Sequence, residues 1–394
     1  MSNYLWQNPE WPHFKWRSEE LNNPLAELHT NQLILEGQMR VLGFNVRSES
    51  TLQRFTQEIQ KSFEIEGLAV SDYSLRSSIA RKLGLEKVIL DNGEKLDSER
   101  PKVTSIVEVI TDAVLNCQTP LTEERLFHWH TQLFGGSAAG LGFNGLYSIR
   151  SGQYRTDEEG PMRVISGNGK NEKVYFEAPP AEILPEQMSA FFEWFNTPDF
   201  ELGLNSVLKS AIAHLYFVEL HPFEDGNGRL ARAIADMALC RGDKIPESGP
   251  RVLHEHLFSM SAQLYKERKD YYQKFQEIET AGSMDITSWL LWYTVCMNRA
   301  VLNVMSELEE GQQRREFWNH IEGLEINERQ RKVLTMLLGD FKGKLTSTKY
   351  AKICNCSQDT ASRDIEKLIK AGILIKGESG GRSTNYLLKN WISL

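Results

Sequence analysis

Residues 221 to 232 read His-Pro-Phe-Glu-Asp-Gly-Asn-Gly-Arg-Leu-Ala-Arg. Apolar residues recur at helical spacing before this stretch, over residues 207–219, and again at its end, over residues 230–239. The stretch is therefore predicted to begin as a loop between two helices and to end inside the second helix. The first backbone N–H groups of that helix have no partner within it and carry its positive dipole end, so an anion placed there is stabilised.

The glycines and arginines of this stretch suit phosphate binding. Gly226 and Gly228 let the backbone approach phosphate oxygens without a Cβ in the way. Arg229 and Arg232 are three residues apart, so on a helix both guanidinium groups project from one face toward the same place.

Two more residues of the stretch can take part in chemistry. Asp225 is a hard oxygen ligand just before the turn, which suits a Mg²⁺ ion that keeps most of its shell as water and phosphate. His221, with an ordinary pKa of about 6.5, can act as a neutral base near pH 7. Together these residues predict a site that handles phosphate groups.

The whole stretch resembles the signature of the Fic family (filamentation induced by cAMP), His-x-Phe-x-(Asp/Glu)-Gly-Asn-Gly-Arg-x-x-Arg, and departs from it at no defined position. The alternative is that His221-Pro222 only ends a helix and that the arginines pair with surface carboxylates, but this leaves the combination of roles unexplained. Fic proteins typically transfer AMP from ATP to a side-chain hydroxyl of a target protein. The resemblance implies a mainly α chain with a Fic-type helical core, acting as a protein adenylyltransferase with ATP as substrate and Mg²⁺ as cofactor.

The resemblance also implies a role for each signature residue. His221 would take the proton from the attacking Ser, Thr or Tyr hydroxyl, and Asp225 would hold Mg²⁺ against the α- and β-phosphates. Arg229 would neutralise the β-phosphate and Arg232 the γ-phosphate. Further nucleotide contacts are implied for Gly226, Asn227 and Gly228 around the α-phosphate and for Tyr272 near the adenine. A core-packed tyrosine is the alternative at position 272.

Upstream, Ser62-Phe63-Glu64-Ile65-Glu66-Gly67 resembles the family's inhibitory motif, (Ser/Thr)-x-x-x-Glu-(Gly/Asn). The motif ends an apolar stripe at helical spacing, and Gly67 is placed to cap that helix; the stripe consists of Leu52, Phe55, Ile59 and Phe63. Glu66 continues the stripe on the buried face, where a carboxylate needs a cation. The resemblance implies that Glu66 pairs with Arg232 and excludes productive ATP binding. The alternative is a solvated Glu66 in the last turn.

A β-hairpin is predicted between the two motifs, because residues 163–166 and 173–176 flank the turn signal Asn168-Gly169. It resembles the Fic flap, which binds the target's segment as an added strand. The resemblance implies target docking through Val164, Ile165, Val174 and Tyr175, whereas a plain structural ribbon is the alternative. Just before it, residues 152–155 (Gly-Gln-Tyr-Arg) resemble the family's Gly-x-Tyr-Arg segment.

The C-terminal part changes in character. Helical patterns over residues 326–338, 347–353 and 357–370 precede a predicted hairpin, 373–375 with 386–388, around Gly380-Gly381, which is the pattern of a winged helix. Residues 321–394 carry a net charge of +5, with thirteen Lys and Arg against eight Asp and Glu, while the whole chain carries −8. This asymmetry suits a module that binds nucleic acid or an acidic surface.

The third predicted helix of this part is the candidate recognition helix. The residues of this helix expected to face a groove are Gln358, Ser362 and Arg363. Two basic residues, Lys376 and Arg382, are expected at the wing. Three acidic residues on the same helix argue against tight phosphate contact: Asp359, Asp364 and Glu366. A protein-binding or dimerisation module is therefore the alternative to DNA binding.

The expected domain plan has an N-terminal helical region carrying the inhibitory helix (1–95), a Fic catalytic domain (96–320) and a winged-helix domain (321–394). A short helical pair is expected over residues 72–95, and the polar residues 91–101 are the candidate linker. A chain of 394 residues with 41% hydrophobic content can bury a large core. Core positions are expected for His214, Trp289, Trp292 and Tyr293.

Five cysteines without Cys-x-x-Cys spacing indicate neither a disulfide framework nor zinc. The chain has no apolar run typical of a signal peptide or a membrane span, so a cytoplasmic protein without a membrane partner is expected. Kinase-like Fic proteins have Lys at the position of Gly228, and this difference favours AMP transfer here.

Three functions remain open at this point. The leading prediction is an autoinhibited protein adenylyltransferase that modifies a target protein or itself. The alternatives are a de-AMPylase on the same fold, with Glu66 orienting a water, and a DNA-binding regulator that uses the Fic body as a sensor. The sequence also leaves open whether the chain acts alone or as a homodimer.

Overall fold

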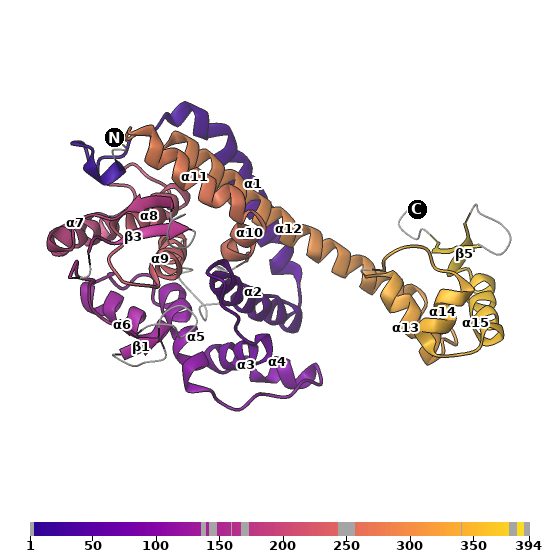
Figure 1. Cartoon of the computed structure of the whole chain (residues 1–394). Coiled ribbons are helices and arrows are strands. Elements are labelled where there is room, and N and C mark those ends of the chain that lie inside the picture. The colour runs from indigo at the N-terminus through magenta and orange to yellow at the C-terminus, as the bar shows by residue number, and fades with distance from the viewer. Residues whose placement is uncertain are drawn as a thin grey trace. The chain divides into compact units, whose positions relative to one another are not determined.

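The computed structural model describes residues 4–134, 139–141, 148–158, 160–166, 173–242, 257–339, 341–377 and 384–389. The chain is mainly α-helical, as predicted, and its contacts divide it into two compact units, Met1–Val304 and Met305–Leu394 (Figure 1). The residues before and after the candidate linker, residues 91–101, belong to the same unit, the first one. In the part of the chain that is described, no helix has the length and apolar character needed to cross a bilayer.

The first unit begins with a single 3₁₀ turn and four helices. These are η1 (Leu5–Gln7), α1 (Ser18–Val41), α2 (Phe44–Ile65), α3 (Asp72–Leu83) and α4 (Glu86–Asp91). Helices α3 and α4 confirm the helical pair expected over residues 72–95. Helix α2 packs against α3, α9 and α10, and Figure 1 shows α2 between α3 and α10.

The rest of the first unit holds the predicted signature helices and the small strands. The elements are α5 (Pro101–Leu115), α6 (Glu123–Leu133), β1 (Ala139–Leu141), β2 (Ser148–Arg150), β3 (Arg163–Ser166), β4 (Lys173–Glu177), η4 (Ala181–Ile183), α7 (Leu184–Asn196), α8 (Ser206–Leu220), α9 (Asn227–Gly242), α10 (Met260–Lys266), α11 (Arg268–Ala281) and the start of α12 (Thr287–His320). Strands β3 and β4 pair antiparallel, which confirms the predicted hairpin. Its expected turn, Asn168-Gly169, lies outside the described residues.

Helices α8 and α9 form the centre of the first unit. Helix α8 is buried around nearly its whole circumference, because it lies between the other helices and has no polar face. One hydrophobic core joins α2 to these two helices and contains Phe55, Ile59, Phe217 and Ile234. The predicted inhibitory helix is therefore part of the same core as the signature helices.

The expected core residues of this unit are also found inside it. His214, Trp289 and Tyr293 are buried, whereas Trp292 is half-buried. The Nε1 of Trp289 donates a hydrogen bond to the Ala211 carbonyl at 2.9 Å, so the indole is satisfied within the core.

The second unit contains the end of α12 and the order of elements expected from its sequence. Its elements are α13 (Glu328–Leu337), α14 (Ser347–Cys354), α15 (Gln358–Lys370), β5 (Leu374–Lys376) and β6 (Tyr386–Leu388). Strands β5 and β6 pair antiparallel. The side chains of Asn327, Thr346 and Ser357 accept N–H groups of the first turns of the three short helices, which explains where each begins.

One of the three acidic residues that were expected to oppose phosphate contact lies inside the second unit. Asp364 is not on the outer face of α15 but is buried, and its carboxylate accepts hydrogen bonds from Arg329 Nε at 2.8 Å and Asn327 Nδ2 at 2.9 Å. It faces inward because the helix turns Asp364 to the same side as the core residues Ala361 and Leu368. The expected turn Gly380-Gly381 and the wing residue Arg382 lie outside the described residues.

Candidate active site

His221 ends helix α8 in a left-handed backbone conformation, with φ 46° and ψ 54°. A residue with a Cβ loses about 1–2 kcal/mol in that region, so other contacts must hold it. The His221 N–H donates to the Phe217 carbonyl at 3.1 Å, and the His221 carbonyl accepts from Arg155 Nε at 2.8 Å. The signature loop therefore starts from a fixed, sharply turned residue.

The imidazole of His221 is arranged as a neutral base. Its Nδ1 lies 3.2 Å from the Val218 carbonyl oxygen. Because a carbonyl only accepts, Nδ1 carries the proton and Nε2 holds the free lone pair. Burial lowers the pKa of His221 to about 4, so the ring is uncharged at pH 7 and Nε2 can take a proton.

The loop after the histidine is closed by Asn227. Its Oδ1 accepts from the Phe223 N–H at 3.0 Å, and its Nδ2 donates to the Phe223 carbonyl at 2.8 Å. Gly226 lies between them with a φ of 88°, which a residue with a Cβ rarely adopts. The Asn227 side chain therefore holds the loop, and the same residue begins α9, whose first backbone N–H groups can face an anion.

Asp225 and Arg229 form an ion pair in which Asp225 Oδ1 lies 2.8 Å from Arg229 Nη2. The same oxygen accepts from the Gly226 N–H at 2.6 Å. The Arg229 guanidinium also lies over two aromatic rings, 5.1 Å from the centroid of Phe63 and 5.1 Å from that of Phe134. Phe63 belongs to α2, so the predicted inhibitory helix contacts the first signature arginine.

Glu66 and Arg232 form the ion pair that the sequence predicts, with Glu66 Oε1 2.8 Å from Arg232 Nη2. Arg232 also donates from Nε to Ser62 Oγ and from Nη2 to the Ser62 carbonyl, both at 2.8 Å. Arg232 is buried, while the Glu66 side chain is about a third exposed at the rim of the site. Burial alone would lower the pKa of Arg232, but the carboxylate of Glu66 beside it raises that pKa.

The end of α2 positions Glu66 for this contact. Gly67 has a φ of 72°, and its N–H donates to the Glu64 carbonyl at 3.0 Å. The Leu68 N–H donates to the Phe63 carbonyl at 3.0 Å, which completes a Schellman cap. Gly67 thus ends the helix as predicted, directly after the carboxylate that reaches Arg232.

Two buried residues outside the signature hold its loop in place, and no role was predicted for either. Arg155 donates to the His221 carbonyl, and its own N–H donates to the Pro222 carbonyl at 2.9 Å. His130 on α6 bonds to the Asp225 carbonyl at 3.0 Å. The Gly-x-Tyr-Arg resemblance was a signal for Arg155, but a single histidine among apolar residues gave no signal for His130.

The β3–β4 hairpin lies beside the histidine, since the ring centroids of Phe176 and His221 are 5.9 Å apart. Val164 and Val174 on this hairpin are exposed, 40% and 42% respectively. The side chains of Ile165 and Tyr175, also expected to dock a target, lie outside what the structure describes. The described part of the hairpin therefore presents two apolar side chains next to the candidate base.

Of the two adjacent tyrosines on α11, Tyr272 is the one at the surface. It is half exposed, and its hydroxyl lies 3.5 Å from the Ile65 carbonyl oxygen at the end of α2. Tyr271 is buried, and its hydroxyl lies 2.8 Å from His214 Nε2. Position 272 therefore carries an accessible aromatic side chain next to the end of α2.

Asp225 is also the residue whose chemistry fits a divalent metal. Among the described residues, no group of three His, Cys, Asp or Glu side chains could hold an ion by itself. A single half-buried carboxylate next to a candidate phosphate-binding turn fits Mg²⁺, which takes its other ligands from water and phosphate oxygens.

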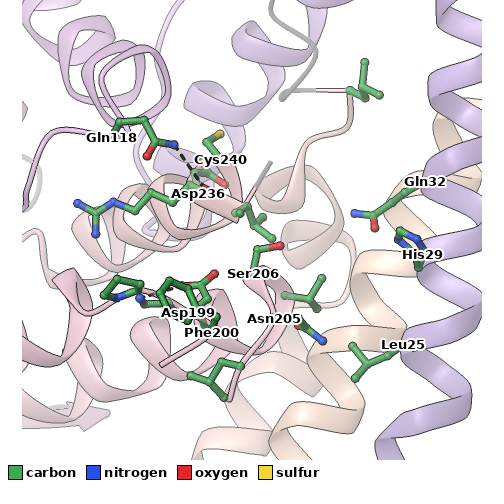
Figure 2. A pocket seen from close by; sticks show the side chains of 18 of the residues that line it. Leu25, His29, Gln32, Gln118, Asp199, Phe200, Asn205, Ser206, Asp236 and Cys240 are labelled. Atoms are coloured by element: carbon green, nitrogen blue, oxygen red, sulfur yellow. Dashed lines mark hydrogen bonds and ion pairs between the residues drawn. The ribbon is translucent and has the colours of Figure 1, made fainter. Parts of the chain in front are cut away.

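A cavity of about 1440 Å³ lies away from the signature loop, and none of residues 221–232 lines it. Figure 2 shows Asp199 and Phe200 on one side of it and Leu25, His29 and Gln32 on the other. Lys209, which also lines it, is paired with Asp199 at 2.8 Å. The Lys209 ammonium in the cavity wall is therefore neutralised by a carboxylate of the protein itself.

Comparisons with known proteins agree with the site. A model described as "Fic/DOC family" matches residues 120–239, and a domain of unknown function (DUF4172) matches residues 4–85. "Protein adenylyltransferase Fic" of Nematostella vectensis is 24% identical over 251 residues, covering 63% of this chain and 48% of that protein. "Protein adenylyltransferase fic-1" of Caenorhabditis elegans is 33% identical over 81 residues, covering 20% and 16%. The chain thus spans about half, or less, of the length of these relatives.

Solved structures were also matched, at lower sequence identity. A Fic family protein from Desulfovibrio desulfuricans G20 has a TM-score of 0.48 and 16% identity, covering 93% of this chain and 96% of that one. Fic-1 from C. elegans has a TM-score of 0.45 and 18% identity, covering 75% and 74%. On the family match and the signature loop within it, residues 120–239 form a Fic/DOC family domain.

Proposed function

We propose that the chain is an autoinhibited protein adenylyltransferase that transfers AMP from ATP to a Ser, Thr or Tyr hydroxyl of a target protein or of the chain itself. The observation that carries the proposal is the neutral Nε2 of His221 next to the amino end of α9, with Arg229 and Arg232 on that helix. The names of the relatives support the same activity.

In the proposed reaction, the target hydroxyl gives its proton to His221 Nε2 as its oxygen attacks the α-phosphorus. The bond between the α-phosphorus and the oxygen bridging to the β-phosphate breaks, and pyrophosphate leaves with the bonding electrons. The first N–H groups of α9 and the Arg229 guanidinium stabilise the charge that develops on the phosphates. Asp225 would hold Mg²⁺, which when bound neutralises phosphate charge.

The proposed autoinhibition follows from the ion pair between Glu66 and Arg232. While Arg232 bonds to Glu66 and to Ser62, its Nε and Nη2 donors are occupied and cannot bind the γ-phosphate, whereas its Nη1 has no hydrogen-bond partner among the described residues. The carboxylate would also repel a triphosphate at the same place. The proposed active state therefore requires Glu66 to leave Arg232.

The hairpin supports a means of binding the target. Val164 and Val174 are exposed beside His221, and an edge strand can pair with an extended peptide through its backbone. A target segment added to this hairpin would bring its hydroxyl near Nε2.

The deciding experiment compares ATP labelled at the α-phosphate with ATP labelled at the γ-phosphate, using wild type, Glu66→Gly and His221→Ala. We expect α-label on protein, strongest with Glu66→Gly and lower by about 10²- to 10⁴-fold without the histidine. Label arriving from the γ-phosphate would make the chain a kinase. No label with Glu66→Gly, either on the chain or on proteins of a lysate, would overturn the proposal.

The reverse reaction is tested with an AMP-modified protein as substrate. A de-AMPylase that uses Glu66 to orient water would release AMP with the wild type and lose this activity with Glu66→Gly. An adenylyltransferase is expected to show the opposite order in the transfer assay: the Glu66→Gly variant attaches more AMP to protein than the wild type does.

For the second unit, we propose nucleic-acid binding through α15. The observation that favours it is that Asp364 is internally paired, which leaves Arg363, Lys367 and Lys370 against two acidic residues on the exposed face. Binding of the full chain to labelled duplex DNA should weaken as salt rises, and Arg363→Glu should weaken it further. Absence of binding at low salt would assign the unit to protein contacts instead.

A further inference from the structure

His130 on α6 uses both ring nitrogens in contacts with other segments. Its Nδ1 accepts from the Gly152 N–H at 2.8 Å, and its Nε2 lies 3.0 Å from the Asp225 carbonyl oxygen. Because an N–H only donates and a carbonyl only accepts, the proton is on Nε2 and the ring is neutral. His130 is fully buried, so water cannot replace either bond.

The ring plane of His130 is fixed as well. It stacks on Phe223, with centroids 4.0 Å apart and planes 11° apart, and the edge contact with Phe134 is at 5.1 Å. Phe223 is the residue whose N–H and carbonyl are both held by Asn227. The imidazole therefore packs on Phe223, which Asn227 holds in place, and bonds to the carbonyl of Asp225 two residues further along the loop.

The Asp225 carbonyl belongs to the peptide that joins Asp225 to Gly226, whose N–H donates to Asp225 Oδ1 at 2.6 Å. A bond that orients this carbonyl also orients that N–H, and with it the carboxylate and the first turn of α9. The other end of the loop is held by Arg155 through the His221 and Pro222 carbonyls. Gly152 bonds to His130, which holds Asp225, and Arg155 bonds to His221 and Pro222 at the start of the loop. The short segment 152–155 thus connects the start of the signature loop with Asp225.

Gly152 is specifically required for this arrangement. It has a φ of 77°, and a Cβ at this position would lie 2.5 Å from Thr131 Oγ1 on α6. Only glycine lets the backbone N–H come close enough to α6 to reach His130.

We infer that His130 is a positioning residue of the proposed transfer reaction: it sets the Asp225 peptide, and through it the metal-binding carboxylate and the anion-binding turn of α9. This inference rests on the proposed function. Helix α6 contributes no residue to the signature, but through His130 it bonds directly to the proposed phosphate site.

The test uses the full chain with Glu66→Gly as the active background and adds His130→Phe or His130→Gln. Phenylalanine keeps the ring volume and the stack on Phe223 but removes both hydrogen bonds. Glutamine keeps a side-chain N–H that can reach the Asp225 carbonyl. His128→Gln, an exposed change on the same helix, is the matched control.

We expect His130→Phe to lower kcat for AMP transfer by about 10-fold or more and to raise by about 10-fold the Mg²⁺ concentration that gives half of the thermal stabilisation by ATP. His130→Gln should recover most of both, and His128→Gln should change neither. A purely structural role would lower the melting temperature without changing kcat of the folded enzyme.

A His130→Phe variant with kcat and Mg²⁺ dependence within twofold of the background would overturn the inference. So would a folded His130→Gln variant as impaired as His130→Phe. If the background itself transfers no label, the proposed function fails, and the Mg²⁺ dependence of ATP binding still tests the role of His130 separately.

Discussion

Gly228 lies directly against the carboxylate of Glu66: a Cβ at position 228 would be 2.4 Å from Glu66 Oε1 and 3.3 Å from Arg232 Nη1. Real Cβ atoms do not approach an oxygen that closely, so the glycine is what gives the carboxylate room beside Arg232. The glycine of the proposed phosphate-binding turn thus also gives room to the ion pair proposed to inhibit the site.

Gly228→Ala should therefore act in opposite directions in two backgrounds. In the wild type, the new methyl group displaces Glu66 from the buried Arg232 and should lower the free energy of unfolding by about 1–3 kcal/mol. With Glu66→Gly the clash is absent, and alanine should be neutral or stabilising by up to about 1 kcal/mol, because it favours a helix. Urea unfolding of the four proteins measures the coupling, and equal effects in both backgrounds would contradict the contact.

Phe63→Leu should raise AMP transfer by releasing the hold of α2 on Arg229. A cation–π contact of about 0.5–2 kcal/mol that is lost in the proposed active state shifts the equilibrium between the two proposed states by about 2- to 30-fold. Phe134→Leu is the matched control, because Phe134 is at the same distance from Arg229 but follows α6 and not α2. Equal rates for the two variants, measured with α-labelled ATP, would show that Phe63 adds nothing to inhibition.

Helices and the hairpins could be predicted because their signals are local. Apolar spacing predicts α2 and α8, and Gly67 marks the end of α2 as the structure has it. The inward position of Asp364 was missed because its partner Arg329 is 35 residues away, on another helix. Sequence spacing within one helix does not reveal such a long-range pair.

The site was predictable to the extent that the signature places its residues next to one another. The Glu66–Arg232 pair was expected only through the family resemblance, since the two residues are 166 positions apart. The use of Asn227 as a loop clamp and the hold of His130 on Asp225 depend on how the backbone turns, which the spacing alone does not determine.

His214 should make the chain sensitive to acid. It is fully buried between aromatic rings, and burial, with a smaller contribution from Arg232, lowers its pKa from 6.5 to about 3. The folded state therefore holds fewer protons than the unfolded state between these values. The stability that this residue contributes is fully present above pH 6.5 and is lost as pH falls, by about 1.4 kcal/mol for each pH unit.

His214→Gln removes this titration and keeps a group that can pair with the Tyr271 hydroxyl. The stability lost between pH 7 and pH 5 should be smaller in the variant than in the wild type by about 2 kcal/mol. Urea unfolding at the two pH values measures the difference. Parallel losses would mean that His214 is protonated in the folded chain.

Two substitutions at His221 can separate the free energy lost in its left-handed backbone from the role of its imidazole in the proposed transfer. His221→Gly and His221→Ala both remove the imidazole, so neither should transfer AMP at a rate near that of the parent. They differ in the backbone, because at a φ of 46° alanine loses about 1–2 kcal/mol and glycine does not.

His221→Gly should therefore be more stable than His221→Ala by about 1 kcal/mol, even though glycine usually destabilises a chain relative to alanine. The control is Ala190→Gly, at an exposed position inside α7, where the glycine should be the less stable partner by about 1 kcal/mol. Opposite signs at the two sites would attribute the difference to the turn at His221. The same sign at both would mean that the residue is not held in the left-handed region, and the orientation of Nε2 toward the incoming hydroxyl in the proposed reaction would then depend on the hydrogen bonds of His221 to Val218 and Arg155.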